Sequence, residues 1–324
     1  MDGIVKNIIK TEIDFLPLDI SYQSIFSYDH DKNTIFEFNV VRYTNTTKEE
    51  KIRKLKGTYL PIVPINHNFH FLKEYLGSFL YYRKHINKNA KIIWINTNIE
   101  TLDYHNNNKP IQKVLEMLSE QNVPMIFLHI DDFKKNNLEF EKIAIIYDPY
   151  PAIVSTQFPP FDQFKHTNNK EVREFFIKFL KKDLFYPKKI YVSRKNVSKY
   201  LKNKNLKNHI SRYNEEHIEN AIEDFFIQKE YSIIDFSGME MEEQIKYMYN
   251  ATHVAGIMGA GTWNGIFCDN GVKYFCIKTH MWFQHDYNKD MESVIDLDYK
   301  LIEIYKKETY GSVINELNQK ILDA

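Results

Sequence analysis

The sequence has few cysteines, no long apolar run and no excess of either charge. Only two of its 324 residues are cysteines, Cys268 and Cys276, and both stand in apolar surroundings. This number excludes a disulfide framework, so we expect two buried thiols in a reducing compartment. No run approaches the roughly 18 apolar residues of a spanning helix, and the first residues lack the blocks of a signal peptide. We therefore expect a cytoplasmic protein with no transmembrane segment.

The charges of the chain balance. Lysine and arginine together number 43, as do aspartate and glutamate. Such a chain has no overall field that attracts nucleic acid or an anionic membrane, so we expect no nucleic-acid partner. Aromatic residues make up 15% of the chain, and we interpret most of them as packing residues rather than as sugar-binding faces.

Glycine is scarce except in one segment. Five of the ten glycines lie between Gly256 and Gly271, directly after the apolar run His253–Met258. A strand that leads into a glycine-rich turn and a helix brings bare backbone close to a ligand, and the first amides of a helix favour an anion. The segment therefore predicts a phosphate or diphosphate site. Its order, Gly-x-x-Gly-x-Gly, differs from the dinucleotide fingerprint, which makes a nicotinamide enzyme a poor fit.

Short apolar runs alternate with helical stripes along both halves of the chain. The pattern predicts edge strands within residues 1–60, and then strands over 91–96, 124–129, 142–147, 189–193, 231–235, 253–258 and 272–277. Helices are expected over 69–86, 111–118, 172–180, 218–226 and 241–249, and after the glycine turn, where the helix would include Cys268. This alternation predicts α/β domains with parallel sheets covered on both faces.

The chain is long enough for two domains, each with its own core. Residues 148–170 contain prolines and show little periodicity, so we place the domain junction there. The predicted domains are residues 1–160 and 161–324, with a C-terminal helix that could return to the first domain.

Two arginines begin and end a polar loop after the first strand of the second domain. Arg194 follows the run Lys189–Ser193, and Arg212 precedes Asn214 and a glutamate pair. An arginine just past a strand end can offer a planar fork to phosphate oxygens. Pairing with a neighbouring carboxylate is an equally good interpretation of each arginine, and Asn214 also suits a helix N-cap.

The order of these motifs resembles glycosyltransferase family 61, which includes enzymes of capsular polysaccharide, xylan and protein O-glycan synthesis. The resemblance spans about residues 189–278, with a weaker echo at Asn68-Phe-His70-Phe-Leu-Lys-Glu74. One departure is Met258, which stands where the family usually has a histidine before Gly-Ala-Gly. The motifs that carry the resemblance contain Arg194, Arg212, Asn214, Glu243, Gly259, Ala260, Gly261, Thr262 and Asn264.

The resemblance implies a GT-B-like architecture, with two Rossmann-like domains that face each other across a cleft. It also implies an inverting glycosyltransferase that moves a sugar from a nucleotide-sugar, with UDP favoured, to a glycan acceptor. The second domain would bind the donor through the residues just named, and the first would bind the acceptor. No obligatory metal or other cofactor is implied. We find no Asp-x-Asp motif in a strand-end loop, because Asp296-Leu-Asp298 is interpreted as part of the C-terminal tail.

Inversion by direct displacement needs one general base at the acceptor hydroxyl. Glu74 and His70 stand four residues apart, so on a helix they would share a face and could supply the base and its orienting partner. A packing or capping role for His70 with a solvated Glu74 is the competing interpretation. Asp103 and His105, after the next strand, are the second candidates.

Two other functions stay open. The loss of the family histidine at Met258 is compatible with altered donor preference, or with a non-catalytic protein that binds a nucleotide-sugar or a glycan. A different nucleotide-using α/β enzyme, such as an epimerase with tightly bound nicotinamide, is the third interpretation.

Overall fold

A computed structural model of the chain divides into two compact units. Unit 1 comprises residues 1–159 and 170–172, and unit 2 comprises residues 160–169 and 173–324. The structure describes residues 8–12, 34–43, 52–62, 72, 76–96, 109–129, 138–147, 169–178, 180–196, 216–279, 291, 294–304 and 309–322. Most of the expected junction, residues 148–168, lies outside the described residues.

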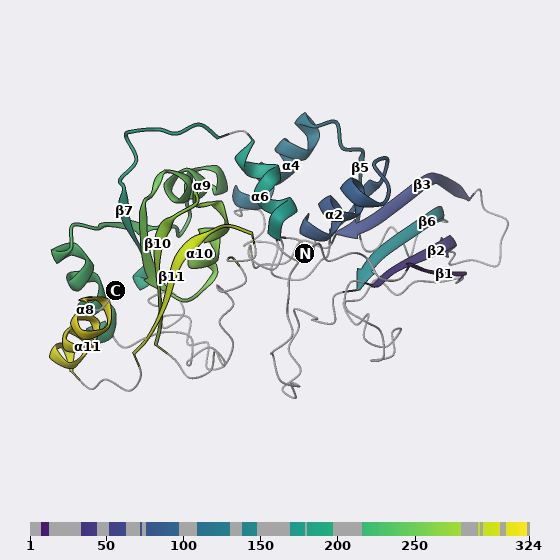
Figure 1. Cartoon of the computed structure of the whole chain (residues 1–324). Helices are drawn as coiled ribbons and strands as arrows, with labels where there is room; N and C mark the ends of the chain where they lie inside the picture. Colours follow the sequence, from purple (N-terminus) through teal and green to yellow (C-terminus); the bar gives the residue numbers. More distant parts are fainter. Residues whose placement is uncertain are drawn as a thin grey trace. The chain divides into compact units, whose positions relative to one another are not determined.

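Unit 1 contains a six-stranded mixed sheet (Figure 1). Its strands lie in the order β1-β2-β6-β3-β4-β5, and all neighbours are parallel except β2 and β6. Helix α2 connects β3 to β4, and α4 connects β4 to β5. The bounds are β1 Ile8–Glu12, β2 Thr34–Tyr43, β3 Arg53–Ile62, α2 Gly77–His85, β4 Lys91–Asn96, α4 Lys109–Glu120, β5 Met125–His129 and β6 Leu138–Tyr147.

The apolar pattern of unit 1 explains these elements. Ile92, Ile93 and Trp94 of β4 are all buried, as expected for a strand covered on both faces. Helix α4 buries Val114 and Leu118 on one stripe and exposes its polar side. The second half of the expected helix over 69–86 is observed as α2, while residues 69–71 and 73–75 lie outside the described residues.

Unit 2 contains a five-stranded sheet in which all neighbouring strands are parallel. The order is β8-β7-β9-β10-β11, which is the doubly wound order 2-1-3-4-5 when the strands are counted along the chain. The bounds are β7 Lys189–Ser193, α8 Glu216–Gln228, β8 Ser232–Asp235, α9 Met241–Asn250, β9 His253–Ile257, α10 Ala260–Trp263, η4 Asn264–Phe267, β10 Val272–Lys278, β11 Leu297–Glu303 and α11 Tyr310–Leu322. Helix α6, Asn169–Ile177, precedes them in the chain and has residues assigned to both units.

Two sequence-based expectations for unit 2 need correction. The helix after the glycine turn is short, because α10 has four residues and passes into the 3-10 turn η4, so Cys268 follows the helix instead of lying in it. Asp298 belongs to β11 and not to a tail, and its Cα is the register partner of Lys273 at the start of β10. Helix α11 packs against α8 within unit 2.

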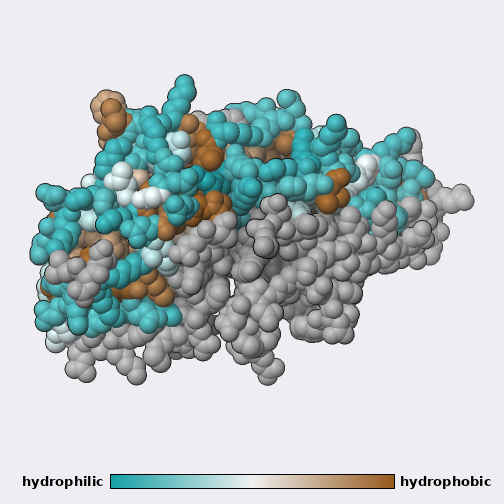
Figure 2. Space-filling view, viewed as in Figure 1, coloured by the Kyte–Doolittle hydropathy of each residue, from teal (hydrophilic) through white to brown (hydrophobic). Residues whose placement is uncertain are grey.

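The core of unit 2 is built on both faces of its sheet. Phe225 and Phe226 of α8 and Leu317 of α11 pack together with buried residues of four strands. Met248 of α9 and Phe267 of η4 are also buried. The alternation of helices and strands thus produces the covered parallel sheet that the sequence predicts. Figure 2 shows that hydrophilic residues form much of the described surface on the side in view.

The two cysteines are confirmed as free, buried thiols. Burial raises the pKa of Cys268 to about 12. A thiol with so high a pKa has little thiolate at neutral pH and is therefore inert. Among the described helices, none is long and apolar enough to cross a membrane.

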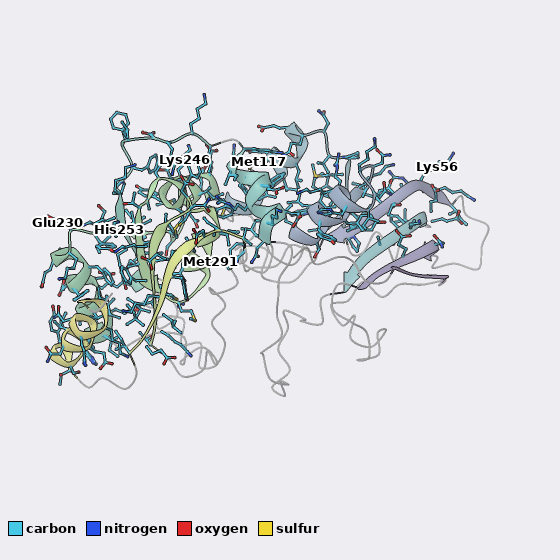
Figure 3. All side chains as sticks on the ribbon, in the orientation of Figure 1. Lys56, Met117, Glu230, Lys246, His253 and Met291 are labelled. Carbon is cyan, nitrogen blue, oxygen red and sulfur yellow. The ribbon has the colours of Figure 1, made fainter. Side chains whose placement is uncertain are left out.

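Gly265 of η4 provides a test of this packing. A Cβ at this position would lie 2.7 Å from both Sδ of Met291 and Cε2 of Tyr274; Met291 is labelled in Figure 3. Because the Tyr274 ring is fully buried and cannot move aside, we expect Gly265→Ala to lower the free energy of unfolding by about 1–3 kcal/mol. Urea denaturation measures this change.

Gly311→Ala is the matched control. Gly311 lies in α11, and a Cβ there would meet nothing within 4 Å. Alanine favours a helix over glycine, so we expect Gly311→Ala to leave stability unchanged or raise it by up to about 1 kcal/mol. Equal stability of the two variants would contradict the tight packing at Gly265.

Candidate functional site

The strand order of unit 2 reverses between β7 and β9. The chain passes from β7 to β8 on one side, and then to β9, β10 and β11 on the other. In open α/β sheets, ligands bind beyond the carboxyl ends of the two strands where the order reverses. We call this edge, formed by Ser193–Lys195 after β7 and Met258–Thr262 after β9, the switch-point edge. Both the first predicted arginine and the glycine turn lie on it.

Arg194 connects the two strand ends. Its Nη1 donates a hydrogen bond to the backbone oxygen of Met258 at 2.5 Å. The guanidinium lies against Gly259, since a Cβ on Gly259 would come within 2.8 Å of Nη1 and 3.0 Å of Cζ. A glycine at 259 therefore allows the arginine to cross the start of the turn. A guanidinium has five N–H donors in a planar fork, which suits phosphate oxygens.

The glycine turn is closely packed on β7. A Cβ on Gly256 would lie 2.7 Å from Cγ2 of Thr262, and a Cβ on Gly261 would lie 3.0 Å from Cγ1 of Val192. These contacts explain why the segment is rich in glycine. They bring the backbone of the turn to the end of β7, where a ligand of the switch-point edge would lie.

Thr262 is the third residue of the short helix α10, and its side chain closes the glycine turn. Its Oγ1 accepts a hydrogen bond from the Gly259 N–H at 2.9 Å and donates to the Gly259 oxygen at 2.8 Å. The Tyr274 hydroxyl of β10 donates to the Thr262 oxygen. The Thr262 side chain and the Gly259 amide thus hold the turn together. Ala260 is the first residue of α10.

Two further expected site residues have partners within the fold. Asn264 is buried and donates from Nδ2 to Oε1 of Gln244 at 2.8 Å, which ties η4 to α9. Glu243 of α9 accepts hydrogen bonds from the Tyr186 hydroxyl, at 2.9 Å to each carboxylate oxygen. The Glu243 contact ties α9 to the connection that precedes β7.

Met258 is buried, with 2% of its surface exposed. Its backbone N–H donates to the Ile277 oxygen of β10 at 2.8 Å, and its own oxygen accepts from Arg194. The backbone of this position therefore supports the site, while its side chain packs in the core.

Glu223 of α8 is a residue of this edge that the sequence did not reveal. It is buried, and its Oε1 accepts from Ser193 Oγ at 2.5 Å. Its Oε2 pairs with Lys195 Nζ at 2.5 Å. One carboxylate thus holds the residues on both sides of Arg194. The available signal was the spacing of Glu219 and Glu223, four residues apart on the flank of an apolar stripe.

A buried tyrosine lies near the same carboxylates. Burial raises the pKa of Tyr191 well above its ordinary value, and the charges of Glu223 and Glu219 act in the same direction. Tyr191 therefore stays neutral at all physiological pH values and packs against Phe226 at a ring-centroid distance of 5.1 Å.

Six residues singled out from the sequence lie outside the described residues, so their roles stay predictions. They are His70, Glu74, Asp103, His105, Arg212 and Asn214. Within the part of the chain that the structure describes, no group of three or more histidine, cysteine, aspartate or glutamate side chains could hold a metal ion.

A family model described as Glycosyltransferase 61 matches residues 68–275. The match covers more than half of the chain. It includes all of the switch-point edge and most of the residues between β3 and β10. No curated protein matches the chain.

Glu223→Ala tests the contacts that Glu223 makes with Ser193 and Lys195, the neighbours of Arg194. The substitution leaves the buried Ser193 hydroxyl without its carboxylate acceptor, and we expect it to lower the free energy of unfolding by about 1–3 kcal/mol. Glu223→Gln keeps an acceptor for Ser193, so a loss of less than half that size is expected. Chemical denaturation of both variants measures the difference, and an Ala variant as stable as the parent would contradict the described network.

Proposed function

The chain belongs to glycosyltransferase family 61, and we propose that it moves a sugar from a nucleotide-sugar to a glycan acceptor with inversion at the anomeric carbon. As a glycosyltransferase it has a donor and an acceptor substrate. We further propose that the donor carries UDP, that the product is a polysaccharide or another glycan made in the cytoplasm, and that no metal is obligatory.

One observation carries the donor part of the proposal. Arg194 and the glycine turn meet at the carboxyl ends of β7 and β9, where the strand order of unit 2 reverses. Transfer of the sugar leaves a diphosphate with increased negative charge, and a preorganised guanidinium stabilises such charge. In the proposal Arg194 does so, and Arg212 and the backbone of the turn assist it.

Unit 1 is proposed to bind the acceptor. The strand order of unit 1 also reverses, between β3 and β6. After β3 the chain adds β4 and β5 on one side of β3, and then returns to form β6 on its other side. His70 and Glu74 follow the carboxyl end of β3 in sequence, as a site at such a point requires. Glu74 would remove the proton of the acceptor hydroxyl, and His70 would orient it. A GT-B-like pairing of the two units is part of the proposal.

Met258 favours a second candidate function. A thioether cannot donate the hydrogen bond that a histidine could offer to the donor. A protein that binds a nucleotide-sugar or a glycan without transferring sugar is therefore the alternative, and it differs from the enzyme in having no turnover.

Arg194→Ala tests the donor site. If Arg194 bonds the diphosphate, we expect UDP binding to weaken by about 1.5–3 kcal/mol, which is roughly 10- to 150-fold in Kd. Gly259→Ala brings a methyl group against the guanidinium and should weaken UDP binding with little change in Tm, because only the flexible end of Arg194 must move. Titration calorimetry and thermal shift with UDP, GDP and CMP sugars measure these effects.

Lys273→Ala is the control for charge. Lys273 is exposed at the amino end of β10, on the opposite edge of the same sheet. His253, labelled in Figure 3, begins β9 on that edge. We expect unchanged UDP affinity for this variant. A Lys273→Ala effect as large as that of Arg194→Ala would argue against a site at the switch-point edge.

Glu74→Gln tests the chemistry. We expect hydrolysis of, or transfer from, a UDP-sugar to fall by about 100-fold or more while UDP binding persists, and the activity of the parent protein to continue in excess chelator. Asp103→Asn is the matched comparison and should retain activity. Loss of activity in Asp103→Asn but not in Glu74→Gln would assign the general base to the second candidate. UDP binding without turnover in the parent protein would favour the alternative function.

A further inference from the structure

The connection between α6 and β7 carries the most exposed apolar side chains among the described residues. Leu184 is 87% exposed and Phe185 is 97% exposed. Figure 1 draws the segment that carries them, between α6 and β7. We call residues 178–189 the basic tip. A neighbouring pair of large apolar side chains held almost wholly in water marks an interaction site.

The backbone of the basic tip is fixed on both sides of this pair. The Asp183 N–H donates to Oδ1 of Asn250 at 2.7 Å, and the Phe185 N–H donates to Oδ1 of Asp183 at 2.9 Å. On the other side, the Tyr186 ring packs on Tyr247 at 5.0 Å. Leu184 and Phe185 are therefore held outward by an ordered turn, so little conformational freedom remains to be lost when they bind.

The charge of the basic tip differs sharply from that of the chain. Residues 178–189 contain five lysines and one aspartate, whereas the whole chain is neutral. Lys181 and Lys188 are exposed on the two sides of the apolar pair. Lys182 is exposed as well, although it also pairs with Asp269 at 3.0 Å. The partner must therefore accept two apolar side chains at the centre and offer negative charge around them.

We propose that the basic tip binds the surface of an anionic lipid bilayer. Leu184 and Phe185 enter the interface between headgroups and acyl chains, and the exposed Lys181, Lys182 and Lys188 lie among anionic headgroups. Half-exposed Lys189 pairs with Glu230 at 3.4 Å and contributes less. Apolar insertion and a basic cluster are each weak alone but together give stable, reversible attachment. A nucleic acid would not use the leucine, which cannot stack on bases, and two side chains are too few for a stable protein interface.

The attachment is compatible with a ligand at the switch-point edge. The basic tip leads into the amino end of β7, where the Lys188 oxygen accepts hydrogen bonds from the N–H groups of Thr252 and His253 at 2.7 and 3.0 Å. Parallel strands begin at one edge of a sheet and end at the other. Bilayer binding and nucleotide binding are therefore proposed for opposite edges of unit 2. Tyr186 of the basic tip also donates to Glu243 of α9, so the variants that test bilayer binding leave Tyr186 unchanged.

Vesicle flotation of the full-length chain tests the proposal. We expect the parent protein to float with vesicles of phosphatidylcholine containing about 30% phosphatidylglycerol, and to bind pure phosphatidylcholine at least tenfold more weakly. The double variant Leu184→Ser, Phe185→Ser should lose at least tenfold in partitioning. Lys181→Glu, at an exposed position, should lose about tenfold at low salt and less at high salt.

Ile227→Ser is the matched control, because Ile227 is a 52% exposed apolar residue of α8 outside the basic tip. It should float like the parent protein. Unchanged UDP affinity and Tm in the double variant would show that the loss comes from the surface and not from unfolding.

Three results would overturn the proposal. The first is no flotation of the parent protein with anionic vesicles. The second is flotation that the double variant retains. The third is a dimer of the parent protein in gel filtration that the double variant separates, which would assign the basic tip to contact between copies of the chain.

Discussion

The candidate site depends on the close approach of two strand ends. The carboxyl ends of β7 and β9 are joined by the bond from Arg194 to the Met258 oxygen, and that bond needs a residue without Cβ at position 259. Gly256 and Gly261 are also too closely packed to carry a Cβ, because Gly256 lies against Thr262 and Gly261 lies against Val192. The proposed diphosphate site would thus use the backbone of the turn and the Arg194 guanidinium, at the point where the strand order of the sheet reverses.

Periodicity predicted the sheet of unit 2 well, because most of its strands are continuous apolar runs between helical stripes. It missed β11, whose sequence Leu-Asp-Tyr-Lys-Leu-Ile-Glu mixes charge with apolar residues, as an edge strand can. The length of the helix after the glycine turn was also overestimated. The sequence gives no sign that the Tyr274 hydroxyl and Asn264 would fix a four-residue helix followed by a 3-10 turn.

Part of the candidate site could be predicted from the sequence. Arg194 and the glycines could be found from the chain, because residue type and position after a strand define their chemistry. Glu223 could not, since its importance comes from a contact across thirty positions in sequence, between a helix and a strand end. The basic tip could not be predicted either, because the zero net charge of the whole chain gives no sign of a local cluster of lysines around two exposed apolar residues.

Tyr274 connects the glycine turn to the interior of unit 2. Its ring is buried in the sheet and stacks on Tyr299 at 5.9 Å, while its hydroxyl bonds to the Thr262 oxygen. The Thr262 carbonyl is therefore held by a hydroxyl of the buried sheet, so a substitution in the core that moves the Tyr274 ring also moves the turn. The glycine turn thus depends on packing residues that would not themselves contact a ligand.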